Sequence, residues 1–152
     1  PVVIFGCFKH DLATIHVALR AVGVTASELS GARHELPAWQ AGQTQALVVQ
    51  GQAGSEGVDL TRARYCIFYS PTYSSQMHEQ AKKRIHRPGQ TRTTFFYYLV
   101  ASRTVEELVY RGLKDKKDGM IAILEGRSKL RPDNQYRAIS DAIAMAEIIS
   151  DN

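Results

Sequence analysis

Short apolar runs that alternate with helix-like segments are the feature that most constrains the fold of this chain. The runs are typical of strands buried on both faces of a sheet, and we expect strands at Val2–Phe8, Val24–Leu29, Ala46–Gln50, Tyr65–Tyr69 and Thr93–Ala101. Helical spacing predicts helices between them, over Lys9–Ala21, Ala32–Gly42, Ser74–His86 and Thr104–Lys117. Because strand–helix–strand units form right-handed crossovers, this order predicts an α/β fold, a three-layer α/β/α arrangement around a mostly parallel sheet.

Local signals refine the ends of these elements. Ser74 or Ser75 is expected to cap the helix that follows it, and Thr104 with Glu107 forms a T-x-x-E capping box. Gly126–Asp133 is interpreted as a linker, and Asn134–Ser150 as a final helix. We therefore expect one globular domain over residues 1–118 and a C-terminal helical extension over residues 119–152.

Composition excludes several classes of protein. The chain has 152 residues, of which 44% are hydrophobic, which is enough for one buried core. Its two cysteines stand in apolar runs without a C-x-x-C pair, so a zinc knuckle and a disulfide framework are improbable and a reducing compartment is expected. The apolar runs are too short to span a membrane. The chain begins at Pro1 and not at Met, and we expect it to be a segment of a longer protein.

The net charge is concentrated in one short segment. The whole chain carries a formal charge of +4, and residues 78–92, with five basic residues and one acidic residue, account for all of it. The basic residues are Lys82, Lys83, Arg84, Arg87 and Arg92. Such a cluster favours a phosphate-bearing partner, although a solvated basic helix face is an equal alternative.

A glycine-rich segment follows the third expected strand. It reads G-Q-A-G-S-E-G-V-D-L-T from Gly51 to Thr61, with three glycines within seven residues. Glycines let the backbone approach a ligand closely, and successive N–H groups can then point at an anion. Asp59 could accept a hydrogen bond from a ribose hydroxyl or from an arginine. A plain turn between two elements is the alternative interpretation.

Two arginines stand three residues apart near the end of the third expected helix. This spacing puts Arg84 and Arg87 on one helix face, just before the Pro88-Gly89 turn. Two guanidinium groups aimed at one place suit a polyphosphate. A favourable interaction with the helix dipole would also explain two cations at this end.

In this order, the two segments resemble motifs V and VI of superfamily 2 helicases, and within them the Swi/Snf-type DNA translocases. Gln80–Gln90 matches the pattern Q-A-x-x-R-x-H-R-x-G-Q at all seven defined positions. Gly54–Leu60 resembles motif V, Val2–Leu12 resembles motif IV, and Thr104–Glu107 resembles the T-x-E-E that opens the following helix. The resemblance covers roughly Val2 to Asp118 and implies the second RecA-like lobe of such an enzyme. Its compact form is similar to phage and bacterial members.

The resemblance also implies roles for individual residues. Arg84 and Arg87 match the catalytic arginines that reach ATP on the opposite lobe, and the other residues implied at the ATP site are Gln80, Gly57 and Asp59. Many members have Asn where this chain has Asp59, which leaves the role of Asp59 open. The residues implied at the DNA are Lys9, Gly31, Gln52, Ser55 and Tyr73. Tyr73 stands where the family usually has Trp; packing against the next helix is its alternative role.

The absent motifs complete this expectation. The chain has no G-x-x-x-x-G-K-[ST] motif and no Asp-Glu pair, so nothing in it is expected to hold the β- and γ-phosphates or a metal ion. The resemblance implies that ATP and Mg²⁺ are held mainly by a first lobe, and that this chain alone is inactive and binds no cofactor. The implied partners are double-stranded DNA and the N-terminal RecA-like lobe, and no membrane is expected. The expected location is the cytoplasm of a bacterial or phage-infected cell, at the nucleoid.

Two other functions stay open from the sequence. The basic segment could belong to a stand-alone nucleic-acid-binding module without ATP chemistry. Gly51–Gly57 could be the phosphate loop of a small nucleotide- or cofactor-binding enzyme.

Overall fold

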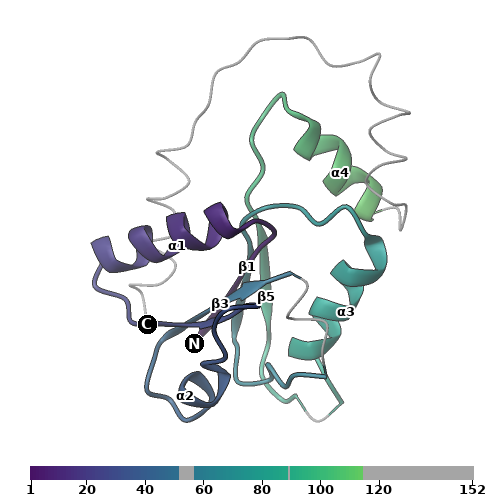
Figure 1. Ribbon diagram of the computed structural model, residues 1–152. Coiled ribbons are helices and arrows are strands. Elements are labelled where there is room, and N and C mark those ends of the chain that lie inside the picture. Colours follow the sequence, from purple (N-terminus) through teal and green to yellow (C-terminus); the bar gives the residue numbers. More distant parts are fainter. Residues whose placement is uncertain (52–56, 89, 115–152) are drawn as a thin grey trace.

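A five-stranded sheet, parallel throughout, forms the centre of the molecule (Figure 1). The computed structural model describes residues 1–51, 57–88 and 90–114. Its strands are β1 (Val2–Gly6), β2 (Ala26–Leu29), β3 (Ala46–Gln50), β4 (Tyr65–Phe68) and β5 (Phe95–Tyr98), in the order β2-β3-β1-β4-β5. The predicted α/β fold with a parallel sheet is confirmed.

Helices cover both faces of this sheet. The described helices are α1 (Lys9–Ala21), α2 (Leu36–Gln40), α3 (Ser75–Ile85) and α4 (Val105–Lys114). Leu12, Ile15 and Leu19 of α1 pack in one core cluster, on the face opposite α3 (Figure 1). Side chains of α2, α3 and α4 join a second cluster on the other face. The three layers predicted from the sequence are therefore present.

The central strand explains why the apolar runs are continuous. All five residues of β1 are buried. Because side chains alternate along a strand, Val3 and Phe5 enter the cluster beside α3, whereas Val2 and Ile4 enter the cluster beside α1. A strand that is buried on both faces needs apolar residues at every position.

Most predicted elements end within two residues of their expected bounds, but two are about half as long as expected. The helix expected at Ala32–Gly42 begins only at Leu36, because the N–H of Ser30 donates to the carbonyl of Arg33 in a turn, and an isolated bridge pairs Leu29 with His34. The last strand covers Phe95–Tyr98 and not all of Thr93–Ala101. The linker at Gly126–Asp133, the helix at Asn134–Ser150 and the boundary at residue 118 lie outside the described residues.

The two capping predictions have different outcomes. Ser74 caps α3, because its hydroxyl oxygen accepts from the N–H of Met77 at 3.3 Å. At α4 the hydroxyl of Thr104 accepts from the N–H of Glu106 at 3.2 Å, but the Glu107 carboxylate accepts from Arg103 and not from Thr104. Arg103 has a φ of 62°, and this left-handed turn brings its N–H toward the carboxylate. The reciprocal capping box expected for Thr104 and Glu107 is therefore wrong in detail.

The described residues hold two free cysteines. Cys66 is fully buried and Cys7 is half-buried. Burial raises the pKa of both thiols, which keeps them protonated and packed. Within the described ranges, no helix has the length and apolar character needed to cross a bilayer.

Candidate functional site

The residues predicted to bind nucleotide and DNA fall at two opposite edges of the sheet. Gly31, Lys9 and Tyr73 follow β2, β1 and β4, so they lie at the edge where the strands end. Helix α3 runs back from that edge, so Arg84 lies at the other edge, where β5 begins (Figure 1). We call these the carboxyl edge and the amino edge. Gly51 follows β3 at the carboxyl edge, and residues 57–61 precede β4 at the amino edge.

At the amino edge, the end of α3 and the segment before β4 are joined by three hydrogen bonds. The N–H of Leu60 donates to the carbonyl of Arg84 at 3.1 Å. A guanidinium nitrogen of Arg87 donates to the carbonyl of Val58 at 3.4 Å, and the side chain of Gln90 donates to the carbonyl of Thr61 at 2.7 Å. The structure therefore brings together the two segments that the sequence singled out.

Asp59 lies within this junction but is held locally. Its Oδ1 accepts from the N–H of Thr61 at 2.9 Å and from the Thr61 hydroxyl at 2.7 Å. These two hydrogen bonds, with a smaller contribution from the charge of Arg87, lower the pKa of the Asp59 carboxyl. The Asp59 side chain is exposed, and the Asp59 backbone carbonyl accepts from the side chain of Gln40 at 2.9 Å. Asp59 thus shapes the turn before β4.

Gly57 and Gln80 complete the predicted nucleotide set. Gly57 is exposed and has a φ of +45°, a left-handed conformation that other residues rarely adopt. Gln80 is partly buried on α3 and stands one turn before Arg84, so both side chains leave the same helix face.

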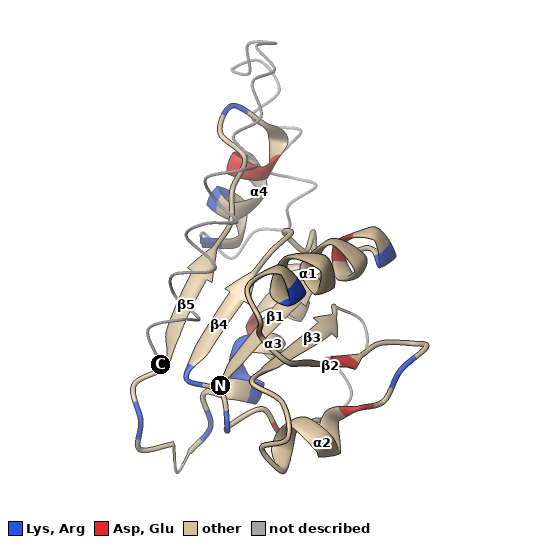
Figure 2. Cartoon of the chain, turned by 90° about the vertical axis from the view of Figure 1, so that its left-hand side faces the viewer, with Lys and Arg blue, Asp and Glu red and all other residues tan. Residues whose placement is uncertain are grey.

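Basic residues gather at the amino edge beyond Arg84 and Arg87. Figure 2 shows Lys and Arg positions around the chain's first residue, where the strands begin. The α-amino group of Pro1 there has a pKa lowered first by burial and then by the charges of Arg62, Arg92 and Arg64. This edge is therefore electropositive. The described residues contain no group of His, Cys, Asp or Glu that could hold a metal ion.

At the carboxyl edge, Asp11 fixes the start of α1 and with it the position of Lys9. One oxygen of its carboxylate accepts from the N–H groups of Cys7 at 3.0 Å and Phe8 at 2.9 Å, and from the Ser70 hydroxyl at 2.7 Å. The first turn of α1 is thereby tied to the loop after β4. Lys9, its first residue, is exposed.

The predicted DNA residues are only partly brought together. Lys9 and Gly31 line one groove, whereas Tyr73 lies between β4 and α3, outside that groove. The Tyr73 side chain is 43% exposed, so it is not the core residue that its alternative role required. Gln52 and Ser55 lie outside the described residues.

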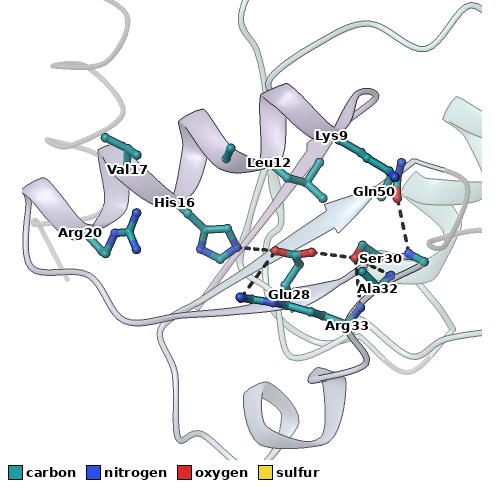
Figure 3. Close-up of a pocket in the computed structure, with 12 residues that line it drawn as sticks. Lys9, Leu12, His16, Val17, Arg20, Glu28, Ser30, Ala32, Arg33 and Gln50 are labelled. Carbon is teal, nitrogen blue, oxygen red and sulfur yellow. Dashed lines mark hydrogen bonds and ion pairs between the residues drawn. The ribbon is translucent and has the colours of Figure 1, made fainter.

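Lys9 and Gly31 line a groove at the carboxyl edge (Figure 3). It has a volume of about 630 Å³ and runs between α1 and the turn that follows β2. Its basic residues are Lys9, Arg20 and Arg33, with Glu28 as the acidic one. Lys9 marks one end, Arg20 marks the other, and the Arg33 side chain runs along the floor past Glu28. An excess of positive charge favours an anionic ligand.

Sequence reasoning missed Glu28 and its partners. Its carboxylate contacts His16 Nε2 at 2.9 Å, the Ser30 hydroxyl at 2.7 Å and an Arg33 guanidinium nitrogen at 3.9 Å. Only 12% of the Glu28 side chain is exposed. A carboxylate inside a short apolar strand was the available signal, but its partner on α1 becomes visible only in the fold.

Comparisons with known sequences agree on one family. The profile described as "Helicase conserved C-terminal domain" matches residues 2–89. Helicase ssl-1 of Caenorhabditis elegans is 39% identical over 79 residues, which are 51% of this chain and 3% of that protein. The chromatin-remodeling ATPase INO80 of Homo sapiens is 33% identical over 82 residues, 54% of this chain and 5% of that protein. The chain therefore corresponds to a small part of these relatives.

A solved structure shares the fold. The crystal structure of the C-terminal part of the Fun30 ATPase domain superimposes with a TM-score of 0.66 and 20% sequence identity. The match covers 99% of this chain and 46% of that chain.

Proposed function

Because the chain belongs to the helicase conserved C-terminal domain family, as the second RecA-like lobe of a Swi/Snf-type helicase, we propose that its amino edge completes an ATP site and its carboxyl edge contacts DNA. The observation that carries the first half is the junction at Leu60 and Arg84, which holds the two arginine positions beside the segment before β4. The groove at Lys9 and Gly31 carries the second half.

The amino edge fits a polyphosphate. Arg84 and Arg87 offer planar donors, and guanidinium groups suit phosphate oxygens. A first lobe would supply the Walker motifs and Mg²⁺. When bound there, ATP would supply the phosphoryl group that is transferred to water. This chain's part is to bring positive charge to oxygens that become more negative during transfer.

The carboxyl edge is proposed to bind a phosphate backbone of duplex DNA. Lys9 offers a cation at the first turn of α1, and the exposed turn at Gly31 lets a backbone approach closely. Tyr73 offers an aromatic face farther along the same edge. The alternative is a nucleic-acid-binding module in which the basic face of α3 is itself the DNA site.

Two substitutions in the full-length protein separate these functions. Lys9→Ala is expected to weaken nucleotide-free DNA binding and to flatten its salt dependence by about 0.9 log units per log unit of salt. Arg84→Ala is expected to leave that binding nearly unchanged and to abolish DNA-stimulated ATP hydrolysis. The measurements are DNA affinity across a salt series and steady-state ATPase rate.

Lys82→Ala serves as the control, because Lys82 lies on α3 but is not among the residues proposed to contact ATP. If Lys82→Ala and Arg84→Ala flatten the salt dependence while Lys9→Ala does not, the basic segment is the DNA site and the proposal is wrong. The same holds if the purified 152-residue chain hydrolyses ATP by itself.

A further inference from the structure

Glu28 occupies the floor of the groove at the carboxyl edge and joins its two walls. Its Oε2 meets His16 Nε2 of α1 at 2.9 Å, and its Oε1 accepts from the Ser30 hydroxyl of the opposite wall at 2.7 Å (Figure 3). Both carboxylate oxygens are therefore engaged. One side chain, largely buried, fixes how α1 and the turn after β2 lie relative to each other.

The Ser30 hydroxyl passes this constraint on to the turn. A hydroxyl has one donor hydrogen and two lone pairs. Because its hydrogen points at Glu28, its lone pairs are left to accept from the N–H groups of Ala32 at 3.1 Å and Arg33 at 3.2 Å. The Ser30 N–H also donates to the carbonyl of Arg33 at 2.8 Å. The backbone that carries Arg33 is therefore held at three points.

This network positions the Arg33 side chain but leaves its guanidinium group able to bind a phosphate. Its guanidinium lies 3.9 Å from Glu28, longer than the other two contacts of that carboxylate, and 57% of its side chain is exposed. An ion pair of this length with an exposed guanidinium contributes little, so a phosphate can replace it. A preorganised cation costs less ordering on binding than a free one.

We propose that Glu28 is a positioning residue for DNA binding: through Ser30 it holds the turn so that Arg33 contacts a backbone phosphate in the groove. This inference rests on the proposed function of the carboxyl edge. Arg33 is then a second phosphate contact beside Lys9, at the part of the groove nearer Arg20. His16 takes part by anchoring Glu28 to α1.

The test is a double-mutant cycle on duplex DNA binding by the full-length protein without nucleotide. Arg33→Ala is expected to weaken binding about eightfold at 0.1 M salt and to flatten the salt dependence by about 0.9 log units, as for one lost phosphate contact. In a Glu28→Gln background, the same Arg33→Ala change is expected to cost less than about twofold, because Arg33 is no longer held. Each cost of Arg33→Ala is measured within a single background. The general electrostatic effect of removing the Glu28 charge on DNA binding therefore cancels from the comparison.

Ser30→Ala provides a second background that leaves the Glu28 charge in place. There too, Arg33→Ala is expected to lose its effect. Arg92→Ala, an exposed arginine outside the groove, is the matched control and should leave the salt dependence unchanged. An equal or larger cost of Arg33→Ala in both backgrounds overturns the positioning role. If Lys9→Ala weakens binding but Arg33→Ala does not, this inference fails alone; if neither does, the proposed DNA edge fails with it.

Discussion

The backbone N–H of Leu60 donates to the carbonyl of Arg84 at 3.1 Å, although 24 positions separate the two residues in the sequence. Leu60 is fully buried, so this bond lies at the edge of the core and not on a mobile surface. It fixes the end of the segment after β3 against the end of α3. The geometry of the proposed ATP edge thus depends on a contact between backbone atoms. Replacing an arginine side chain leaves this contact in place, so a change in activity can be assigned to the missing side chain.

Arg87→Ala in the full-length protein is expected to lower kcat by about 10³–10⁵, with a much smaller effect on ATP binding. The guanidinium of Arg87 donates only to the Val58 carbonyl among the contacts described, at 3.4 Å, so it can turn toward a phosphate. Arg87→Lys should not restore the rate, because Lys lacks the planar donor pair. DNA-stimulated ATPase kinetics measure both effects. A rate for Arg87→Ala within about twofold of wild type would contradict the role.

Ser74→Ala is expected to destabilise the domain by about 1 kcal/mol, since the Ser74 hydroxyl satisfies the N–H of Met77 at the start of α3. Urea denaturation of the 152-residue chain measures the change. Ser74→Thr should recover most of the loss because Thr also caps helices. Ser102→Ala is a control at an exposed position. Equal midpoints for wild type and Ser74→Ala would show that the cap does not stabilise the fold.

His78 is expected to make the domain less stable in mild acid. Its side chain is buried against the ring of Phe68, with Nε2 3.1 Å from the Tyr98 hydroxyl. Burial, then the charge of Lys82, lowers the pKa of His78, while Glu79 opposes them. The unfolded chain therefore takes up a proton near pH 6.5, whereas the folded chain takes it up only at a lower pH.

The sign follows from proton linkage. Stability falls as the pH drops below the unfolded pKa, by at most about 1.4 kcal/mol per pH unit from this group. Denaturation at pH 7.5 and pH 5.5 should show a smaller loss for His78→Gln than for wild type. An identical pH dependence in the two proteins would mean that His78 becomes protonated in the fold as readily as outside it.

The order of elements was predictable because their signals are local. The apolar run of β1, the periodicity of α1 and the cap at Ser74 each lie within a few residues. The start of α2 was not predictable in this way. The sequence Ala32–Gly42 can form a helix, but Ser30 and His34 are engaged in the turn after β2, and helix begins beyond them. Pro37 stands in the first turn of α2, where a missing N–H costs nothing.

The candidate site also has one part that the sequence could predict and one part that it could not. Arg84 and Arg87 could be found because helical spacing and a contiguous pattern mark them. The groove could not, since His16 and Glu28 come from different elements and meet only when β2 packs beside α1. A count of charge along the sequence also favoured residues 78–92, whereas Lys9, Arg20 and Arg33 become a basic group only in space.

Helix α3 gives the domain a mechanical property. It spans the sheet from the edge near Tyr73 to the edge near Arg84, about 16 Å for its eleven residues. His78, Ala81 and Ile85 are buried, so the helix is anchored on the sheet both in its middle and at its arginine end. The hydrogen bond from the Leu60 N–H to the Arg84 carbonyl holds that same end of the helix in place. Helix α3 is therefore a strut of fixed length, and the distance between the arginine end and the tyrosine end cannot change unless a residue of the helix changes its secondary structure.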